Sequence, residues 1–264
     1  MTTAFVHGIN ISYDDAGQGT PLVFVHGHPF NRSMWQDQVS ALRWRYRVIT
    51  PDLRGYGETT VTPGIVSLTD MAADIAGLLD ELEIERAVLA GLSMGGQIVL
   101  EFYRLYSARV RALILADTSA QAETEEGKGI RRATAERLLR EGMSLYAGEI
   151  LPKMLSAHTI AHQRGVAARV LTMMQTTPPV GAAAALRGRA ERPDYVELLS
   201  RISVPTLVVV GSDDEFTPVS DAEFMHARIP SAQIAVIAGT GHMPNMEKPN
   251  EFNQLLIEFL ERLS

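Results

Sequence analysis

One serine of the chain lies between two glycines, in the pentapeptide GLSMG at positions 91–95. An apolar run (86–92) precedes this serine, and a helical pattern (95–106) follows it. The arrangement matches G-x-S-x-G, the pattern of a sharp strand-to-helix turn that exposes a serine side chain. A serine hydroxyl is a weak nucleophile until a nearby base accepts its proton. The pattern therefore predicts that Ser93 is a nucleophile if the fold brings a base to it.

A base and an acid follow two later apolar runs. His242 lies in GTGHMPNMEKP (239–249), and Asp214 lies in GSDDEFTP (211–218). Loops at the carboxyl ends of parallel strands share one edge of a sheet, so these residues can meet Ser93 there. The chain order Ser…Asp…His is that of one hydrolase fold and differs from other protease folds. We expect His242 to be the base and Asp214 to orient its imidazole.

Three other carboxylates compete with Asp214 for this role. Asp213 is adjacent to it, Glu215 follows it, and Asp117 ends an earlier apolar run. Asp117 could instead cap the start of the segment that follows it. The residue types alone leave these alternatives open, because any carboxylate beside the imidazole can stabilise its charged form.

Attack on an ester carbonyl creates an oxyanion that needs fixed hydrogen-bond donors. The backbone N–H of Met94, at the start of the expected helix, is one natural donor.

His26 and His28 form an H-x-H pair, a pattern that suggests a metal site. A catalytic zinc usually has three protein ligands, however, and the residues that follow the pair, Pro29 and Phe30, cannot supply a third. The glycines near Ser93 do not match the dinucleotide pattern G-x-G-x-x-G. We expect neither a metal nor a cofactor.

Short apolar runs bounded by Gly or Pro predict buried strands, and amphipathic patterns between most of them predict helices. The expected strands are 21–27, 46–53, 86–92, 110–118, 205–212 and 233–239, and the expected helices are 68–83, 95–106, 220–229 and 249–263. Alternating strands and helices predict an α/β fold with a mostly parallel, doubly wound sheet. The opening segment predicts an antiparallel edge hairpin, and Thr69 is the expected N-cap of the first helix.

The segment 120–194 contains no strand-like run and is charged and helix-prone. We expect it to form a helical cap, or lid, inserted late in the sheet of a core made of 1–119 and 195–264. Ligands of open α/β folds bind at the edge that such a cap would cover. Five large apolar side chains are candidates to line a pocket there, although packing in the core is the favoured interpretation for any single one: Phe30, Trp35, Met154, Met173 and Met174.

Composition narrows the function classes. The chain has 264 residues, 46% hydrophobic and 21% charged, as in ordinary globular proteins. A net charge of −7 disfavours nucleic-acid binding, and the lack of cysteine excludes disulfides and thiolate catalysis. We see no signal peptide and no run long enough to span a membrane. We therefore expect a cytoplasmic protein with a small-molecule substrate. The sequence gives no indication of its oligomeric state.

Five segments together resemble the α/β-hydrolase superfamily, nearest to its small esterases, enol-lactonases and cofactor-free haloperoxidase-like members: HGHP (26–29), DLRGYGET (52–59), GLSMGG (91–96), GSDDEFTP and GTGHMPNMEKP. The resemblance covers nearly all of 21–264 and is weakest over 120–194. It implies an α/β-hydrolase fold, Asp214 as the acid by the spacing Gly-x-x-Asp, and the His28 N–H as the second oxyanion donor. It also implies that DLRGYGET is a structural loop.

The expected activity is hydrolysis of a small-to-medium carboxylic ester through an acyl-enzyme, without a cofactor. A lactonase acting on an enol-lactone or an acyl-homoserine lactone is the main alternative, with perhydrolysis as a side activity. Dehalogenases and epoxide hydrolases of this fold need a carboxylate where Ser93 stands. A non-enzymatic alternative is a receptor that captures a small ligand, because a shared fold does not fix function.

Overall fold

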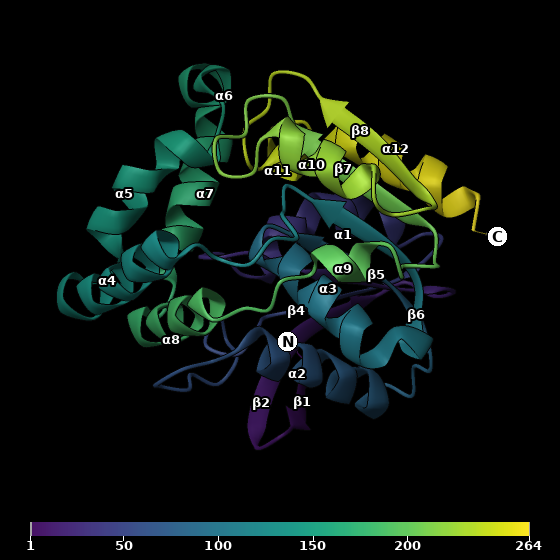
Figure 1. Cartoon of the computed structure of the whole chain (residues 1–264), viewed down its shortest axis with the longest axis horizontal. Helices are drawn as coiled ribbons and strands as arrows, with labels where there is room; N and C mark the ends of the chain where they lie inside the picture. The colour runs from purple at the N-terminus through teal and green to yellow at the C-terminus, as the bar shows by residue number, and fades with distance from the viewer. Residues whose placement is uncertain (1, 264) are drawn as a thin grey trace.

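Eight strands form one sheet in the order β1-β2-β4-β3-β5-β6-β7-β8 (Figure 1). The computed structural model describes residues 2–263. The strands are β1 (Thr2–Val6), β2 (Ile9–Ala16), β3 (Pro21–Val25), β4 (Arg47–Pro51), β5 (Ala87–Leu92), β6 (Val110–Ala116), β7 (Thr206–Gly211) and β8 (Ala232–Ile237). The pairs from β4 through β8 are parallel, whereas β1–β2 and β2–β4 are antiparallel. The predicted α/β fold and edge hairpin are confirmed, and the six predicted strands agree within two residues at each end.

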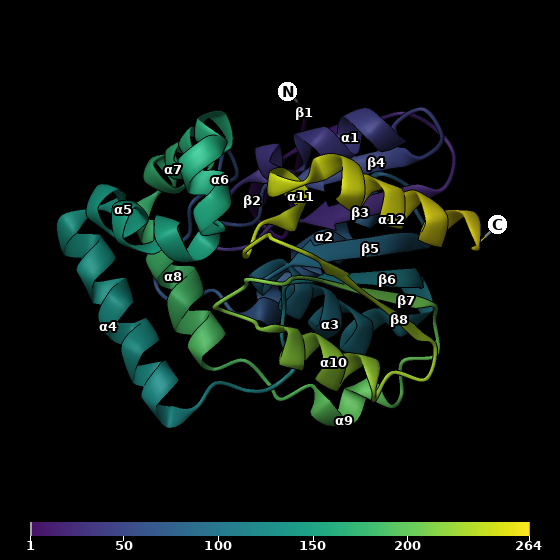
Figure 2. The ribbon, with the colours of Figure 1, turned by 90° about the horizontal axis from the view of Figure 1, so that it is seen from above.

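Helices cover both faces of the sheet (Figure 2). Those outside the inserted segment are η1 (Arg32–Trp35, a 3-10 turn), α1 (Gln36–Leu42), α2 (Leu68–Glu81), α3 (Met94–Tyr106), η2 (Ser107–Arg109, a 3-10 turn), α9 (Val196–Leu199), α10 (Val219–His226), α11 (Pro244–Glu247) and α12 (Pro249–Glu261). Figure 2 shows α1, α11 and α12 on one side of the sheet and α3, α9 and α10 on the other. None of the helices described here is long and apolar enough to cross a membrane.

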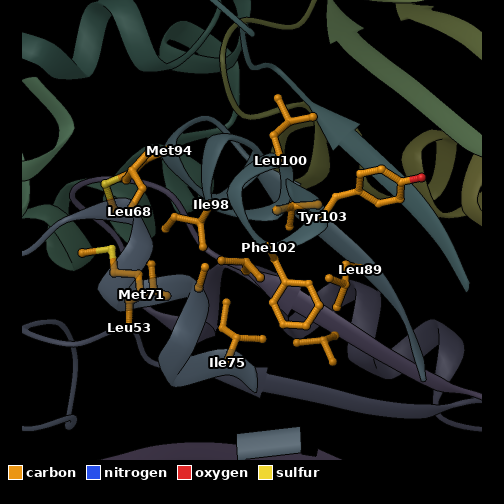
Figure 3. Packing of buried hydrophobic residues seen from close by; sticks show 14 of the residues in the cluster. Leu53, Leu68, Met71, Ile75, Leu89, Met94, Ile98, Leu100, Phe102 and Tyr103 are labelled. Atoms are coloured by element: carbon orange, nitrogen blue, oxygen red, sulfur yellow. The ribbon is translucent and has the colours of Figure 1, made fainter. Parts of the chain in front are cut away.

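Alternation along the strands divides the core into two clusters. Leu22 and Phe24 of β3 pack with residues of α1 and α12, whereas the intervening Val23 and Val25 pack with residues of α2 and α3. Successive side chains of a strand point to opposite faces, so a strand buried on both faces must be apolar throughout. Figure 3 shows the second cluster, where Ile98 and Phe102 of α3 lie among strand and α2 side chains. These layers hold the carboxyl ends of the strands in fixed positions.

The helix α2 begins at a residue other than the predicted one. Ser67, not Thr69, is the N-cap: its hydroxyl accepts a hydrogen bond from the Asp70 N–H, and the Asp70 carboxylate accepts one from the Ser67 N–H. Thr69 lies inside the helix, and its hydroxyl donates to Glu101 at 2.5 Å. The prediction was wrong because both residues are good caps, and only Ser67 is followed three residues later by a side chain that returns the bond.

Replacing Ser67 by alanine is expected to lower the free energy of unfolding by about 1 kcal/mol, because the helix loses its N-cap acceptor. Urea unfolding followed by circular dichroism measures the change. Ser67→Thr keeps the hydroxyl and serves as the matched control, with at most half of that loss. Equal losses in the two variants would show that the side-chain cap contributes nothing.

Five helices lie in the inserted segment between β6 and β7: α4 (Glu125–Glu141), α5 (Met143–Met154), α6 (Ala157–His162), α7 (Arg164–Thr176) and α8 (Pro179–Ala190). They lie together at one end of the molecule, on the left in Figures 1 and 2. α4 and α8 pack through a small apolar cluster of their own that includes Leu138 and Leu186. The Val66 N–H donates to the Ala184 carbonyl at 3.1 Å, which ties α8 to the loop before α2. We keep the division into a core and a cap of 120–194 as a proposal.

Candidate active site

Ser93 connects β5 to α3 in a strained conformation. Its backbone has φ +57° and ψ −119°, a region that residues with a side chain rarely adopt. The last residue of β6 and a residue just beyond that strand hold the turn: the Ser93 N–H donates to the Ala116 carbonyl at 3.0 Å, and the Thr118 hydroxyl donates to the Ser93 carbonyl at 2.7 Å. Strain of this kind persists only where the surrounding structure imposes it, and it is common at functional sites.

The flanking glycines are needed for close approach. A Cβ on Gly91 would lie 2.3 Å from the Gly95 carbonyl oxygen, and a Cβ on Gly95 would lie 2.2 Å from the Val25 carbonyl oxygen. Neither glycine has a positive φ; the strained conformation belongs to Ser93 itself. The two glycines of G-x-S-x-G are therefore required because each lies against a backbone carbonyl, and these close contacts let the chain turn sharply at the serine.

His242 and Asp214 form a buried, hydrogen-bonded pair. His242 Nδ1 and Asp214 Oδ2 are 2.8 Å apart, and His242 is 2% exposed. Asp214 also accepts bonds from the Phe216 N–H at 2.8 Å and the Thr217 hydroxyl at 2.6 Å. Burial opposes ionisation of Asp214, but His242 and these donors outweigh it and lower the pKa of the carboxyl group. With Nδ1 engaged, Nε2 is the ring nitrogen left for a reacting hydroxyl.

The competing carboxylates lie in different environments. Asp213 and Glu215 are exposed, and Asp213 accepts a hydrogen bond from the Ser212 hydroxyl. Asp117 is buried, and its Oδ1 accepts from the Gly211 N–H at 2.9 Å. Asp117 also lies near the His242–Asp214 pair: one carboxylate oxygen of each aspartate and one ring nitrogen of His242 are all within 4.8 Å of one another. Burial and the neighbouring Asp214 charge raise the pKa of Asp117 well above its ordinary value, which favours the neutral acid.

The HGHP loop lies directly against the serine turn. β3 pairs with β5, with Val25 opposite Gly91, and a Cβ on Gly27 would lie 3.1 Å from the Ser93 Cβ. The next residue, His28, therefore follows a segment in contact with the candidate nucleophile. Met94 is the first residue of α3, so its N–H has no acceptor within the helix. This is the arrangement expected of two oxyanion donors, a role that stays a prediction for both residues.

The two histidines of this loop have other partners than a metal. His26 Nε2 accepts from the Leu53 N–H at 2.9 Å, and its Nδ1 is 2.9 Å from the Gly27 carbonyl. His28 Nδ1 is 2.8 Å from the Tyr56 hydroxyl. Burial lowers the pKa of both imidazoles. Within residues 2–263, neither histidine belongs to a group of three potential metal ligands.

Ser93 and His242 line one cavity of about 210 Å³ between the sheet edge and the inserted helices. Of the five apolar side chains expected to line a pocket, Met154 does so. The other four correct that expectation. Phe30, Trp35 and Met174 are fully buried in the core, and Met173 borders a separate surface hollow. Large apolar side chains pack into cores as readily as into pockets, so residue type alone did not distinguish them.

Sequence reasoning missed the charged part of the cavity lining. Arg131, Arg189 and Arg192 line it together with Glu123 and Tyr146. The segment that holds these arginines was predicted only to be charged and helix-prone, and nothing singled them out, since arginine is mostly exposed in proteins. One signal was available: Arg189 lies in the Ala-rich stretch GAAAALRGRA, most of which is buried. A charged side chain in a buried stretch points to a partner or a ligand.

Comparison with known proteins places the chain among hydrolases. The family model for the alpha/beta hydrolase fold matches residues 20–249. The chain is 33% identical to 3-oxoadipate enol-lactonase 1 of Acinetobacter baylyi, over 92% of this chain and 89% of that protein. A thermophilic esterase from Thermogutta terrifontis, solved with malate bound, is 40% identical with a TM-score of 0.97, and the match covers 99% and 98% of the two chains. The enol-lactonase from Burkholderia xenovorans LB400 is 26% identical with a TM-score of 0.92, covering 98% and 100%.

Proposed function

The chain belongs to the α/β-hydrolase family, and we propose that it is a serine hydrolase that cleaves small carboxylic esters through an acyl-enzyme. One observation carries the proposal. Ser93, held in a strained turn, lines the same cavity as His242, whose Nδ1 is bonded to the buried Asp214. Relatives that include an esterase and an enol-lactonase support hydrolysis of an ester or a lactone.

In the acylation step, Ser93 Oγ attacks the carbonyl carbon while His242 Nε2 accepts the hydroxyl proton. The carbonyl oxygen becomes an oxyanion, which the N–H groups of His28 and Met94 stabilise. As the tetrahedral intermediate collapses, His242 donates the proton to the leaving oxygen. An alcohol departs, and the acyl group stays on Ser93.

Deacylation repeats these steps with water. His242 accepts a proton from the water that attacks the acyl-enzyme, and then returns it to Ser93 as the acid leaves. Asp214 fixes the imidazole orientation and stabilises its charged form in both steps. The lowered pKa of Asp214 keeps it ionised for this purpose. Hydrogen peroxide in place of water would give a peracid, the predicted side activity.

Lactone hydrolysis is the second candidate, favoured by the similarity to the enol-lactonase of Acinetobacter baylyi. The same residues would act, but the leaving oxygen would stay attached to the acyl group, giving one hydroxy or oxo acid. A ligand-binding receptor on this fold stays the non-enzymatic alternative, and an intact Ser93–His242–Asp214 set disfavours it. Cytoplasmic location stays a prediction.

The test is acid release in a pH-stat, with EDTA present, from acyclic esters and lactones of matched carbon number. We expect turnover of at least one class, unaffected by EDTA. Treatment with a dialkyl p-nitrophenyl phosphate should inactivate the enzyme and add one phosphoryl group per chain, which peptide mass spectrometry should map to Ser93. Absence of acid from every substrate, or full activity after Ser93 is modified, would contradict the proposal.

A further inference from the structure

The cavity beside Ser93 is positively charged in a protein of net negative charge. Three guanidinium groups, of Arg131, Arg189 and Arg192, line it against the single carboxylate of Glu123, whereas the whole chain carries −7. A cavity that concentrates one sign of charge attracts ligands of the opposite sign. The charge therefore belongs to this site and does not reflect the composition of the protein.

Two of these arginines already have an anionic partner. Glu123 accepts hydrogen bonds from Arg131 Nε and, at 2.9 Å, from Arg192 Nη1. These two arginines lower the pKa of Glu123 to about 2 against the opposing effect of burial, so Glu123 stays ionised. One carboxylate thus serves two guanidinium groups, and the third has none.

Arg189 is the third. Its Nε donates to the neutral Gln97 side chain at 2.8 Å, and within residues 2–263 no carboxylate forms an ion pair with it. Its two terminal amino groups make no hydrogen bond to any described residue. Burial, together with Arg131 and Arg192, lowers the pKa of Arg189, which means that its charged form is costly here. An uncompensated charge of this kind is relieved by a bound anion.

The free part of this guanidinium is a fork suited to a carboxylate. Two parallel N–H groups can bind both oxygens of one carboxylate, an arrangement that is stronger and more specific than a single point charge. The cavity volume of about 210 Å³ admits only a small molecule, so a carboxylate at Arg189 and an ester carbonyl at Ser93 would belong to a compact substrate.

We propose that Arg189 binds a carboxylate of the substrate, so that the preferred substrates are small esters or lactones that carry a second, ionised carboxyl group. This inference rests on the proposed function and specifies its substrate class. Core loops supply the reacting groups, while α8 of the inserted segment supplies the specificity-determining residue. The reaction that precedes this enzyme must then leave a free carboxylate on the ester or lactone, and its product is a dicarboxylate or a hydroxy acid.

The test compares each anionic ester with a neutral analogue of nearly the same shape. Monoethyl succinate against ethyl succinamate places the carboxylate on the acyl side, and acetoxyacetate against acetoxyacetamide places it on the alcohol side. In the pH-stat we expect kcat/KM to favour the anion about 10- to 100-fold in at least one pair, the range expected for a charge-assisted hydrogen-bond pair.

Two variants assign the preference to the residue. Arg189→Met should lose the preference mainly through a higher KM for the anionic ester, so that its kcat/KM for the anionic ester approaches its kcat/KM for the neutral analogue. Arg187→Met is the matched control on the same helix, because Arg187 bonds to Gly64 and Glu136 outside the cavity. It should keep the preference. Succinate should inhibit hydrolysis of the neutral ester competitively, with an inhibition constant that rises at least tenfold in Arg189→Met only.

The outcomes separate this inference from the proposed function. Turnover of neutral and anionic esters at equal efficiency in both pairs, or a preference that survives Arg189→Met, overturns the role of Arg189 and leaves the hydrolase intact. No turnover of any ester overturns the proposed function; succinate binding is then measured directly by calorimetry, and equal affinity for wild type and Arg189→Met overturns the anion site too. Activity of Arg189→Met on the neutral ester shows that the variant folds.

Discussion

Replacing Ser93 by alanine is expected to reduce kcat for ester hydrolysis by a factor of about 10⁴ or more. Without the hydroxyl no acyl-enzyme can form, and only the residual effect of the oxyanion donors and of substrate binding remains. The pH-stat measures the loss. The variant should still bind the substrate or a product-like carboxylate, because the hydroxyl contributes little to ground-state binding.

The matched control is Ser119, the second serine that lines the cavity. Ser119→Ala removes a hydroxyl from the same cavity but not from the strained turn, and should keep activity within about tenfold of wild type, since it removes at most a neutral hydrogen bond. If Ser119→Ala abolished activity while Ser93→Ala preserved it, the nucleophile would be misassigned. If neither variant changed the rate, the acyl-enzyme mechanism would be wrong.

A glycine at position 93 tests the strain separately from the chemistry. Ser93→Gly should be as inactive as Ser93→Ala, but it should be more resistant to urea than the alanine variant because glycine adopts a positive φ without steric cost. Equal resistance of the two variants would show that the φ of +57° stores no appreciable strain.

The sheet was predictable because its strands are short, apolar and bounded by Gly or Pro. β5 is buried at every position, and a short, wholly apolar run of this kind is typical of a strand buried on both faces of a parallel sheet. The helix α1 (Gln36–Leu42) was not predicted. It is only seven residues long and its side chains are of mixed burial, so its periodicity is too short to be recognised. The N-cap of α2 was predicted at Thr69 instead of Ser67, because both residue types cap helices and only Ser67 forms reciprocal hydrogen bonds with a side chain three residues later, that of Asp70.

The reacting residues could be proposed from the sequence because they follow strand ends of a parallel sheet, whose topology brings those ends to one edge. The strain could not be assigned in advance. The pattern predicted a sharp turn but not which residue adopts the positive φ; the structure gives it to Ser93 and uses Gly91 and Gly95 for backbone contact. The assignment depends on contacts with residues distant in sequence, such as that between Gly95 and the Val25 carbonyl, and a five-residue pattern does not contain them.

The cavity lining was the least predictable part. Arg131 comes from α4, and Arg189 and Arg192 come from the end of α8 and the residues after it, so their meeting depends on how the inserted helices pack. Helix packing leaves the sequence separation of contacting residues unconstrained, unlike a sheet edge, where order is set by strand pairing. The same limit explains why Phe30 and Trp35 were indistinguishable from pocket residues.

Replacing Asp214 by asparagine is expected to lower kcat about 10⁴-fold. An amide carries no charge to stabilise the imidazolium, and its NH2 group can bond to the imidazole in the wrong tautomer, leaving Nε2 unable to accept the Ser93 proton. The loss should appear in kcat with little change in KM, because Asp214 acts through His242 and does not itself line the cavity.

Asp117→Asn is the matched control, because the same substitution is made in the other buried carboxyl group near His242, whose raised pKa favours the neutral form. Asparagine keeps an oxygen that can accept from the Gly211 N–H, so activity should stay within about tenfold of wild type. A 10⁴-fold loss in Asp117→Asn with an active Asp214→Asn would assign the acid to Asp117. Equal, severe losses in both would mean that the two carboxyl groups act as one unit with His242.

The same control has a stability consequence of definite sign. The pKa of Asp117 is raised in the folded protein, so above its ordinary value of 3.8 the unfolded chain releases a proton that the folded chain retains. The folded state then binds more protons, and this group makes the wild-type protein less stable as the pH rises toward the folded pKa. Asparagine removes that dependence. The stability of Asp117→Asn relative to wild type should therefore increase from pH 4 to neutrality in urea unfolding. A flat difference would mean that Asp117 is ionised in the fold, and that two adjacent carboxylates share the charge of one imidazolium.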